Sequence, residues 1–132
     1  MKSEFREIIA YQGACFTIEW FYDERGYSEV LDYYKQLPPR FRQKLLGLLR
    51  HMGDVGRILD KTKFRHEGDQ IYAFKPQPDR FLCFFFKGGK IIITNAFAKK
   101  ADKLPKQEKQ KALRYRADYE QRIKEGTYYE DL

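Results

Sequence analysis

Basic side chains stand at the ends of apolar runs in the second half of the sequence. Lys75 ends one short run, Arg80 leads the next, and Lys99 and Lys100 follow a third. Because only a proline-containing turn lies between Lys75 and Arg80, their side chains could converge. Arginine suits phosphate binding, since its planar fork holds two oxygens and it never loses its charge. This pattern predicts an anion-binding pocket at one rim of a sheet.

The apolar runs predict the sheet that would position these cations. Residues 80–87 and 90–97 flank Gly88-Gly89, a pair that reaches the positive φ angles of a tight hairpin turn. Residues 81–86 are all apolar, so both faces of that strand should be covered by helices and the strand should lie mid-sheet. With the alternating segment 71–75, these runs predict a three-stranded antiparallel meander.

Helical spacing dominates much of the remaining chain. Apolar residues three and four positions apart predict an antiparallel helical hairpin whose two helices meet at Pro38-Pro39. The segment 1–14 has two interpretations, a short amphipathic helix or a mobile arm. The expected elements are a strand at 15–22, helices at 28–36 and 39–52, the second ended by Gly53, a linker loop at 55–69, strands at 71–75, 80–87 and 90–97, and a basic helix at 105–125.

This order predicts an α+β domain in which an antiparallel meander carries an N-terminal helical hairpin and a C-terminal helix. We expect one compact domain over residues 1–132, with residues 1–14 as an N-terminal extension and 127–132 as a tail.

Composition narrows the classes of partner. The formal charge is +7, from 26 Lys and Arg against 19 Asp and Glu, and a basic surface attracts nucleic acid, anionic membranes or acidic proteins. Cys15 and Cys83 lie in apolar runs, which predicts buried free thiols in a reducing compartment. With no long apolar stretch or cleavable leader, we expect a soluble, cytoplasmic protein. Because His51 and His66 are the only histidines, we expect no multi-histidine metal centre.

Three pieces of the chain resemble the RelE/HigB/ParE superfamily of bacterial toxins, and the HigB-like, phage-derived branch is the most similar. The first piece is the strand 71–75, with an aromatic near its start and a lysine at its end, and the second is the arginine-led strand 80–84. The most specific piece is Asn95-Ala96-Phe97-Ala98-Lys99-Lys100, followed by Leu104-Pro105 and a basic helix. In that branch it commonly reads His-Gly-Phe-x-Lys-Lys. The resemblance covers residues 15–119.

The resemblance implies a RelE-like fold, a compact sheet with the helical hairpin on one side and the last helix nearby. It also implies the activity of many members, which are metal-independent endoribonucleases that often cut messenger RNA (mRNA) within the ribosomal A site. A cognate antitoxin blocks such a toxin. For this chain the implied partners are therefore mRNA, the ribosome and an antitoxin of the helix-turn-helix type, with no membrane, cofactor or metal.

RNA cleavage without metal needs a base for the 2′-hydroxyl, cations for the phosphate in the transition state, and an acid for the leaving 5′-oxygen. By the resemblance, Arg80 stabilises the transition state, although it could instead close a surface turn with Asp79. Lys75 binds phosphate, or acts as the base if neighbouring cations lower its pKa. Lys99 and Lys100 match the Lys-Lys pair and bind phosphate, and strand alternation lets only one of them face the site.

Three further residues have two interpretations each. His66 either transfers a proton or is incidental to the loop. Tyr72 either stacks on an RNA base or packs in the core. Asn95 stands where branch members often have histidine, and it can hydrogen-bond RNA but cannot shuttle a proton. Ala73 likewise stands where relatives often have glutamate.

These two departures keep alternatives to the nuclease open. The first is a superfamily member without nuclease activity, such as a gyrase-directed ParE-like toxin or a catalytically silent relative that binds RNA or protein. The second is a plain RNA-binding module whose aromatic side chains stack on bases.

Overall fold

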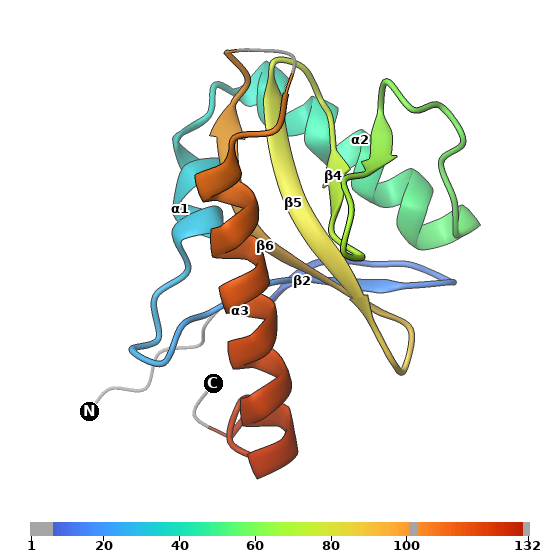
Figure 1. The fold of residues 1–132 in the computed structure, drawn as a ribbon. Helices are drawn as coiled ribbons and strands as arrows, with labels where there is room; N and C mark the ends of the chain where they lie inside the picture. The colour runs from blue at the N-terminus through green and yellow to red at the C-terminus, as the bar shows by residue number, and fades with distance from the viewer. Residues whose placement is uncertain (1–6, 101–102, 131–132) are drawn as a thin grey trace.

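The computed structural model describes residues 7–100 and 103–130. Six strands form a single sheet in the order β1-β2-β6-β5-β4-β3, and three helices pack against it (Figure 1). The strands are β1 (Ile9–Gln12), β2 (Thr17–Trp20), β3 (Phe64–His66), β4 (Tyr72–Phe74), β5 (Asp79–Phe86) and β6 (Lys90–Ala98), and the helices are α1 (Glu29–Gln36), α2 (Pro39–Val55) and α3 (Lys106–Glu125).

The two longest strands, β5 and β6, form the centre of the sheet as an antiparallel hairpin. Gly88 and Gly89 form its turn with φ angles of 83° and 71°, a conformation that a side chain would disfavour. Strand β2 pairs with β6 in parallel, whereas every other pair of neighbours is antiparallel. The predicted meander is therefore present, but it is one half of a larger mixed sheet.

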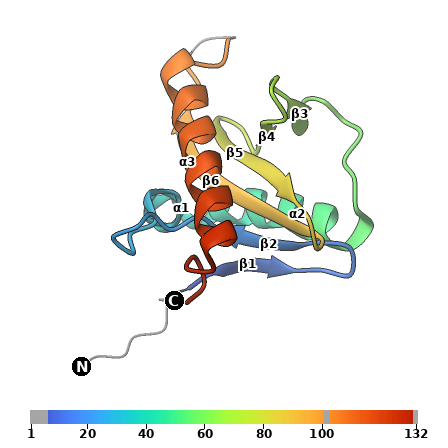
Figure 2. The same cartoon turned by 60° about the horizontal axis from the view of Figure 1, so that its bottom comes forward.

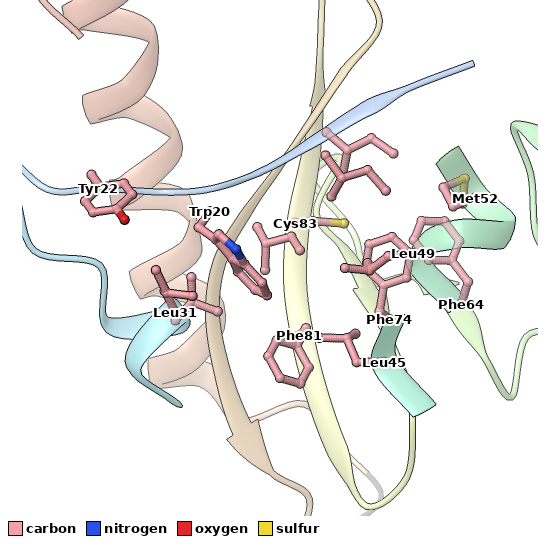
Figure 3. Close-up of a cluster of buried hydrophobic side chains, with 14 residues drawn as sticks. Trp20, Tyr22, Leu31, Leu45, Leu49, Met52, Phe64, Phe74, Phe81 and Cys83 are labelled. Carbon is pink, nitrogen blue, oxygen red and sulfur yellow. The ribbon is translucent and has the colours of Figure 1, made fainter. Parts of the chain in front are cut away.

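The helices lie in two layers, with α1 and α2 on one face of the sheet and α3 on the other (Figures 1 and 2). Strand β5 alternates between them. Phe81 and Cys83 belong to the core beneath α1 and α2, whereas Leu82 and Phe84 belong to the core beneath α3. Figure 3 shows the first core, in which side chains of α2 face those of the sheet. The prediction that both faces of this strand are covered is confirmed.

Two segments differ from the sequence-based expectation. Residues 9–12 form β1 rather than a helix, because they pair with β2. Helix α2 continues past Gly53 and ends at Val55, where Gly56 takes the left-handed conformation with φ 94°. The segment 55–69 is likewise more than a linker, because its residues 64–66 form β3. The part of the N-terminal interpretation that concerns residues 1–6 lies outside the described residues.

The turn before β2 packs closely on Gly53 of α2, where an added Cβ would lie 2.7 Å from Cδ2 of the Tyr11 ring. The N–H groups of Cys15 and Phe16 both donate to the carbonyl oxygen of Gly53, at 2.7 and 3.0 Å. That carbonyl lies in the last turn of α2, so the turn before β2 satisfies a group that the helix itself leaves unpaired. An added Cβ at Gly13 would lie 2.2 Å from the carbonyl carbon of Gly53. Both glycines are therefore required by packing.

The two cysteines are free thiols in different environments. Cys83 is buried, and its burial raises the pKa of its thiol, as its position in an apolar run predicts. Cys15 is exposed and donates to the carbonyl of Asp54 at 3.2 Å, so the prediction of burial is wrong for this residue, which precedes β2 rather than lying within it. Within residues 7–100 and 103–130, no helix has both the length and the apolar character needed to cross a membrane.

The contacts of the glycines predict opposite effects of two alanine substitutions. Gly13→Ala should lower the free energy of unfolding by about 1–3 kcal/mol, because the new methyl group meets backbone. Gly47→Ala, in the middle of α2 with nothing within 4 Å of an added Cβ, should raise it by about 0.5–1 kcal/mol. Urea denaturation measures both values, and equal effects of the two substitutions would contradict this packing.

Candidate functional site

A cleft of about 440 Å³ opens at the rim of the sheet where β4 ends, β5 begins and β6 ends. In Figure 1 this rim is the upper end of the sheet. There the N–H of Lys99 also donates to the carbonyl of Pro78 at 3.0 Å. Five basic side chains and one acidic side chain line the cleft, together with three apolar ones. These residues are Arg65, Glu67, Ala73, Lys75, Arg80, Phe97, Lys99, Lys103 and Leu104.

Strand alternation places these side chains on one face. In the register of the sheet, Arg65 is opposite Ala73 and Ala73 is opposite Leu82, which packs beneath α3. Arg80 is opposite Phe97, which packs on the same side. Lys75 lies two positions after Ala73, and Lys99 two after Phe97, so the pleat directs them the same way. The cleft is thus built on the α3 face of the sheet by neighbouring strands.

Arg80 is the most buried cation of the cleft, with 6% of its surface exposed. Its Nη1 donates to the carbonyl oxygens of Asp79 and Pro78, at 3.0 and 3.3 Å, and to Oε1 of Gln77 at 3.3 Å. Within the described part of the chain, Nε and Nη2 make no such bond. Burial lowers the pKa of Arg80, while the carboxylates of Glu67 and Asp79 act in the opposite direction. The tight turn therefore holds the guanidinium in place and leaves one edge for a ligand.

The carboxylate of Asp79 supports the turn from the other face of the sheet. It is buried and accepts a hydrogen bond of 2.5 Å from the hydroxyl of Tyr33 on α1. This contact and the burial around it raise the pKa of Tyr33. Asp79 thus binds the helical hairpin to the start of β5 and is not the side-chain partner of Arg80.

Lys75 lies beside Arg80 and is half-buried. Its Nζ donates to the carbonyl oxygen of Lys61 at 3.1 Å. Burial lowers the pKa of Lys75, and the positive charges of Arg80 and Arg65 lower it further. An amine with a lowered pKa exchanges a proton more readily near neutral pH, which is the property that a general acid or base needs.

Among the described residues, Glu67 is the single acidic side chain that lines the cleft. Its backbone N–H donates to the carbonyl of Ile71 at 2.7 Å, which closes a turn just after β3. Helix α3 holds this turn, because Lys109 pairs with Asp69 at 2.9 Å and Arg116 donates to the carbonyl of Asp69 at 3.0 Å. Among the described residues, no basic group lies within ion-pair distance of the Glu67 carboxylate. This carboxylate is therefore available to accept a proton or a hydrogen bond from a ligand.

Sequence reasoning missed Glu67, Arg65 and Lys103 as members of the site. The first two lie in the segment that we expected to be a linker loop. The signal was the alternation Phe64-Arg65-His66-Glu67, in which two charged residues two positions apart follow a buried aromatic.

His66 and Tyr72, both predicted to act at the site, do not line the cleft. They pair with each other across β3 and β4 and lie one position away from residues that line it. Their rings are 4.8 Å apart, and Tyr72 stacks on Phe64 at 5.4 Å in the core beneath α1 and α2. Both side chains therefore lie on the face of the sheet opposite the cleft, because neighbouring positions of a strand point to opposite faces.

Asn95 is fully buried and is not positioned to touch RNA. Its Nδ2 donates to the backbone and side-chain oxygens of Glu108, at 3.1 and 3.0 Å, and its Oδ1 accepts from Thr94 at 2.6 Å. A bulge in the β5–β6 pairing between Leu82 and Cys83 accommodates Thr94 and Asn95. The hydrogen bonds of Asn95 therefore join β6 to α3. Of the predicted lysine pair, Lys99 lines the cleft and Lys100 does not.

Within residues 7–100 and 103–130, no three His, Cys, Asp or Glu side chains are grouped so that they could hold a metal ion.

The crowding of cations predicts that the pKa of Lys75 depends on Arg80. It should lie below 10.5 and should rise in Arg80→Met, because a neighbouring positive charge is removed while burial remains. A side-chain NMR titration of the lysine Nζ and Cε measures this shift. Arg25→Met, in the exposed turn before α1, is the matched control and should leave the titration of Lys75 unchanged. A pKa that is the same in Arg80→Met would contradict the proposed proximity.

Comparison with known proteins identifies the family. The family model described as phage-derived protein Gp49-like (DUF891) matches residues 32–117, which is about two thirds of the chain and includes every residue that lines the cleft. No curated protein matches the chain significantly. Gp49-like proteins form part of the RelE/ParE-like toxin superfamily and are commonly toxins of toxin–antitoxin systems. The chain therefore belongs to the family of phage-derived Gp49-like proteins.

Proposed function

We propose that this chain is a HigB-like toxin of a type II toxin–antitoxin system, and that it cleaves mRNA on the ribosome at the basic cleft. The observation that carries the proposal is the gathering of five cations around one carboxylate on a single rim of the sheet. A scissile phosphate carries one negative charge and gains a second in the transition state. Fixed cations stabilise that added charge more strongly than they stabilise the ground state.

Arg80 is the main stabiliser of the phosphate in this proposal. Its Nη1 is hydrogen-bonded to the turn 77–79, so the side chain loses little further conformational freedom when RNA binds. Arg65 and Lys99 line the same cleft and supply further positive charge. Ala73, Phe97 and Leu104 give the cleft an apolar part on which a ribose or a base can rest.

Glu67 and Lys75 supply the proton transfers. The Glu67 carboxylate accepts the proton of the 2′-hydroxyl while the 2′-oxygen forms a bond to phosphorus. The bond between phosphorus and the 5′-oxygen breaks, and the ammonium of Lys75 donates a proton to that oxygen. The products are a 2′,3′-cyclic phosphate and a 5′-hydroxyl, and solvent then restores both side chains. Each step uses residues of the chain and no metal ion.

Glu67 could replace the glutamate that relatives often have at the position of Ala73. Ala73 lines the cleft, and its strand partner Arg65 lies two positions before Glu67 on the same face. A carboxylate is therefore supplied from the turn after β3 rather than from β4. The alternative, a toxin that binds its target without cutting RNA, is favoured by Asn95, since a buried amide replaces the histidine that branch members often carry.

Removal of the cleft cations should abolish cleavage. We expect Arg80→Met to lower the single-turnover rate on a ribosome-bound mRNA by about 10²–10³-fold, because a transition-state contact is lost. Arg65 is exposed, so Arg65→Met should lower the rate without destabilising the fold. Arg57 is exposed and lies outside the cleft, so Arg57→Met is the control.

Primer extension maps the cuts, and a substrate with 2′-deoxyribose at the cut site should resist cleavage. Cleavage by Arg80→Met and Arg65→Met at the control's rate would refute the proposal, and growth arrest with intact mRNA would support the non-nuclease alternative.

The pH dependence of the rate should separate the roles of Glu67 and Lys75. Cleavage needs Lys75 protonated, so the rate should fall as pH rises through its pKa, which lies below 10.5. Lys75→Arg should move this descending limb to higher pH, since arginine keeps its proton. Glu67→Gln should lower the rate by about 10²–10⁴-fold, because the group that accepts the 2′-hydroxyl proton is lost. An unchanged pH profile in Lys75→Arg and an unchanged rate in Glu67→Gln would show that other groups transfer the protons.

A further inference from the structure

A second hollow lies between α2 and residues 58–63, and it reaches residues 75–77 of the turn that holds Arg80. Two adjoining parts of about 450 and 500 Å³ share Lys44, Leu48 and Lys63. We call this hollow the α2 groove. Its apolar part includes Leu48, Ile58 and Leu59, and the side chain of Leu59 is 76% exposed. These three side chains line one hollow with basic and polar neighbours, and an apolar patch with a polar rim is typical of a surface that binds a partner.

Gly47 is the second unusual feature of this surface. It lies in the middle of α2 and lines the groove, and an added Cβ would meet nothing within 4 Å. Glycine inside a helix costs about 1 kcal/mol relative to alanine. Gly53 of the same helix is explained by the Tyr11 ring packed on it, but no described residue explains Gly47. A partner that approaches α2 closely at this point would explain it.

The rim of the groove is basic. Lys44, Lys63 and Lys75 line it, and His51 lies at its far end. Its one acidic residue, Asp60, accepts hydrogen bonds from the N–H and hydroxyl of Thr62, which lower the pKa of Asp60. A fitting partner therefore carries acidic residues on both sides of an apolar stripe.

These properties favour a helix over RNA as the occupant. Among the described residues, His51 is the one aromatic ring that lines the groove, so successive RNA bases would find no series of rings on which to stack. Aliphatic side chains in a shallow groove instead fit the apolar stripe of an amphipathic helix, with contacts at i, i+3, i+4 and i+7. The absence of a side chain at Gly47 lets the backbone of such a helix approach closely.

The groove is physically connected to the cleft. Lys75 lines both. The side chain of Gln77 bridges them, because its Nε2 donates to the carbonyl of Thr62 at 3.2 Å while its Oε1 accepts from Arg80 at 3.3 Å. An acidic helix in the groove would therefore attract Lys75 away from RNA phosphate and contact the residues that hold Arg80.

The geometry points to the α2 groove as the docking site for an acidic amphipathic helix of the antitoxin, a helix that inhibits cleavage through Lys75 and Gln77. This inference rests on the proposed toxin–antitoxin function.

The test is Gly47→Met, which fills the groove and leaves the cleft unchanged. The probe is the purified product of the reading frame adjacent to the gene, titrated into the intact toxin by isothermal titration calorimetry. We expect Gly47→Met to fold at least as stably as the wild type, because methionine favours a helix more than glycine does. Its affinity for the probe should fall by more than about tenfold, as for a residue at the centre of an interface. When the two are co-expressed, this variant should still arrest growth.

Arg50→Met, exposed on α2 but outside the groove, is the matched control and should bind as the wild type does. Equal binding by Gly47→Met and the wild type would overturn the docking site and leave the toxin–antitoxin assignment intact. If the wild type itself does not bind the probe, the assignment fails and the inference fails with it. If Gly47→Met keeps the probe's affinity but loses affinity for a single-stranded oligoribonucleotide, the groove binds RNA and the inference is overturned.

Discussion

The constraint on which the site depends is the pleat of the sheet, which sends alternate side chains of a strand to opposite faces. At the rim formed by β3 to β6, it directs Arg65, Lys75, Arg80 and Lys99 toward the side of α3. The same alternation places His66 and Tyr72 among the aromatic residues of the other face. The positive charges of these four side chains repel one another, so the arrangement persists only because the strands fix the backbone beneath it. A polyanion in the cleft would relieve that repulsion.

Buried polar contacts hold the elements that border the cleft. Asn95 joins β6 to Glu108 of α3, and Glu29 of α1 binds Lys111 and Tyr115 of α3 at 3.1 and 2.5 Å. Glu29 and Glu108 thus fix the first turns of α3, directly after Lys103 and Leu104, which line the cleft. Together with the Tyr33–Asp79 contact, these bonds connect α1 and α3 to the rim.

Much of the fold follows from local patterns in the sequence. The helices and β4 to β6 were predicted because periodicity and glycine turns depend on neighbouring residues. The parallel pairing of β2 with β6 joins residues 17–20 to residues 90–93, and no local pattern encodes that contact. Strand β3 was missed because three residues, two of them charged, form a strand only when β4 lies beside them.

The candidate site divides in the same way. Arg80, Lys75 and Lys99 were predicted because a basic residue at the end of an apolar run remains at the rim wherever the strand packs. Glu67 and Arg65 required the register of β3, and His66 lies one position from each of them, which places it on the opposite face. The pocket for anions was thus foreseeable, whereas the carboxylate that could complete its chemistry was not.

Binding of an RNA that cannot be cleaved tests the central claim most directly. A short oligoribonucleotide with a 2′-O-methyl group at the cut site would be titrated into isotope-labelled protein and followed by NMR. The account predicts that signals of Arg65, Lys75, Arg80 and Phe97 shift together and saturate at one affinity. Shifts confined to Tyr72, Phe85 and their neighbours on the opposite face would contradict it.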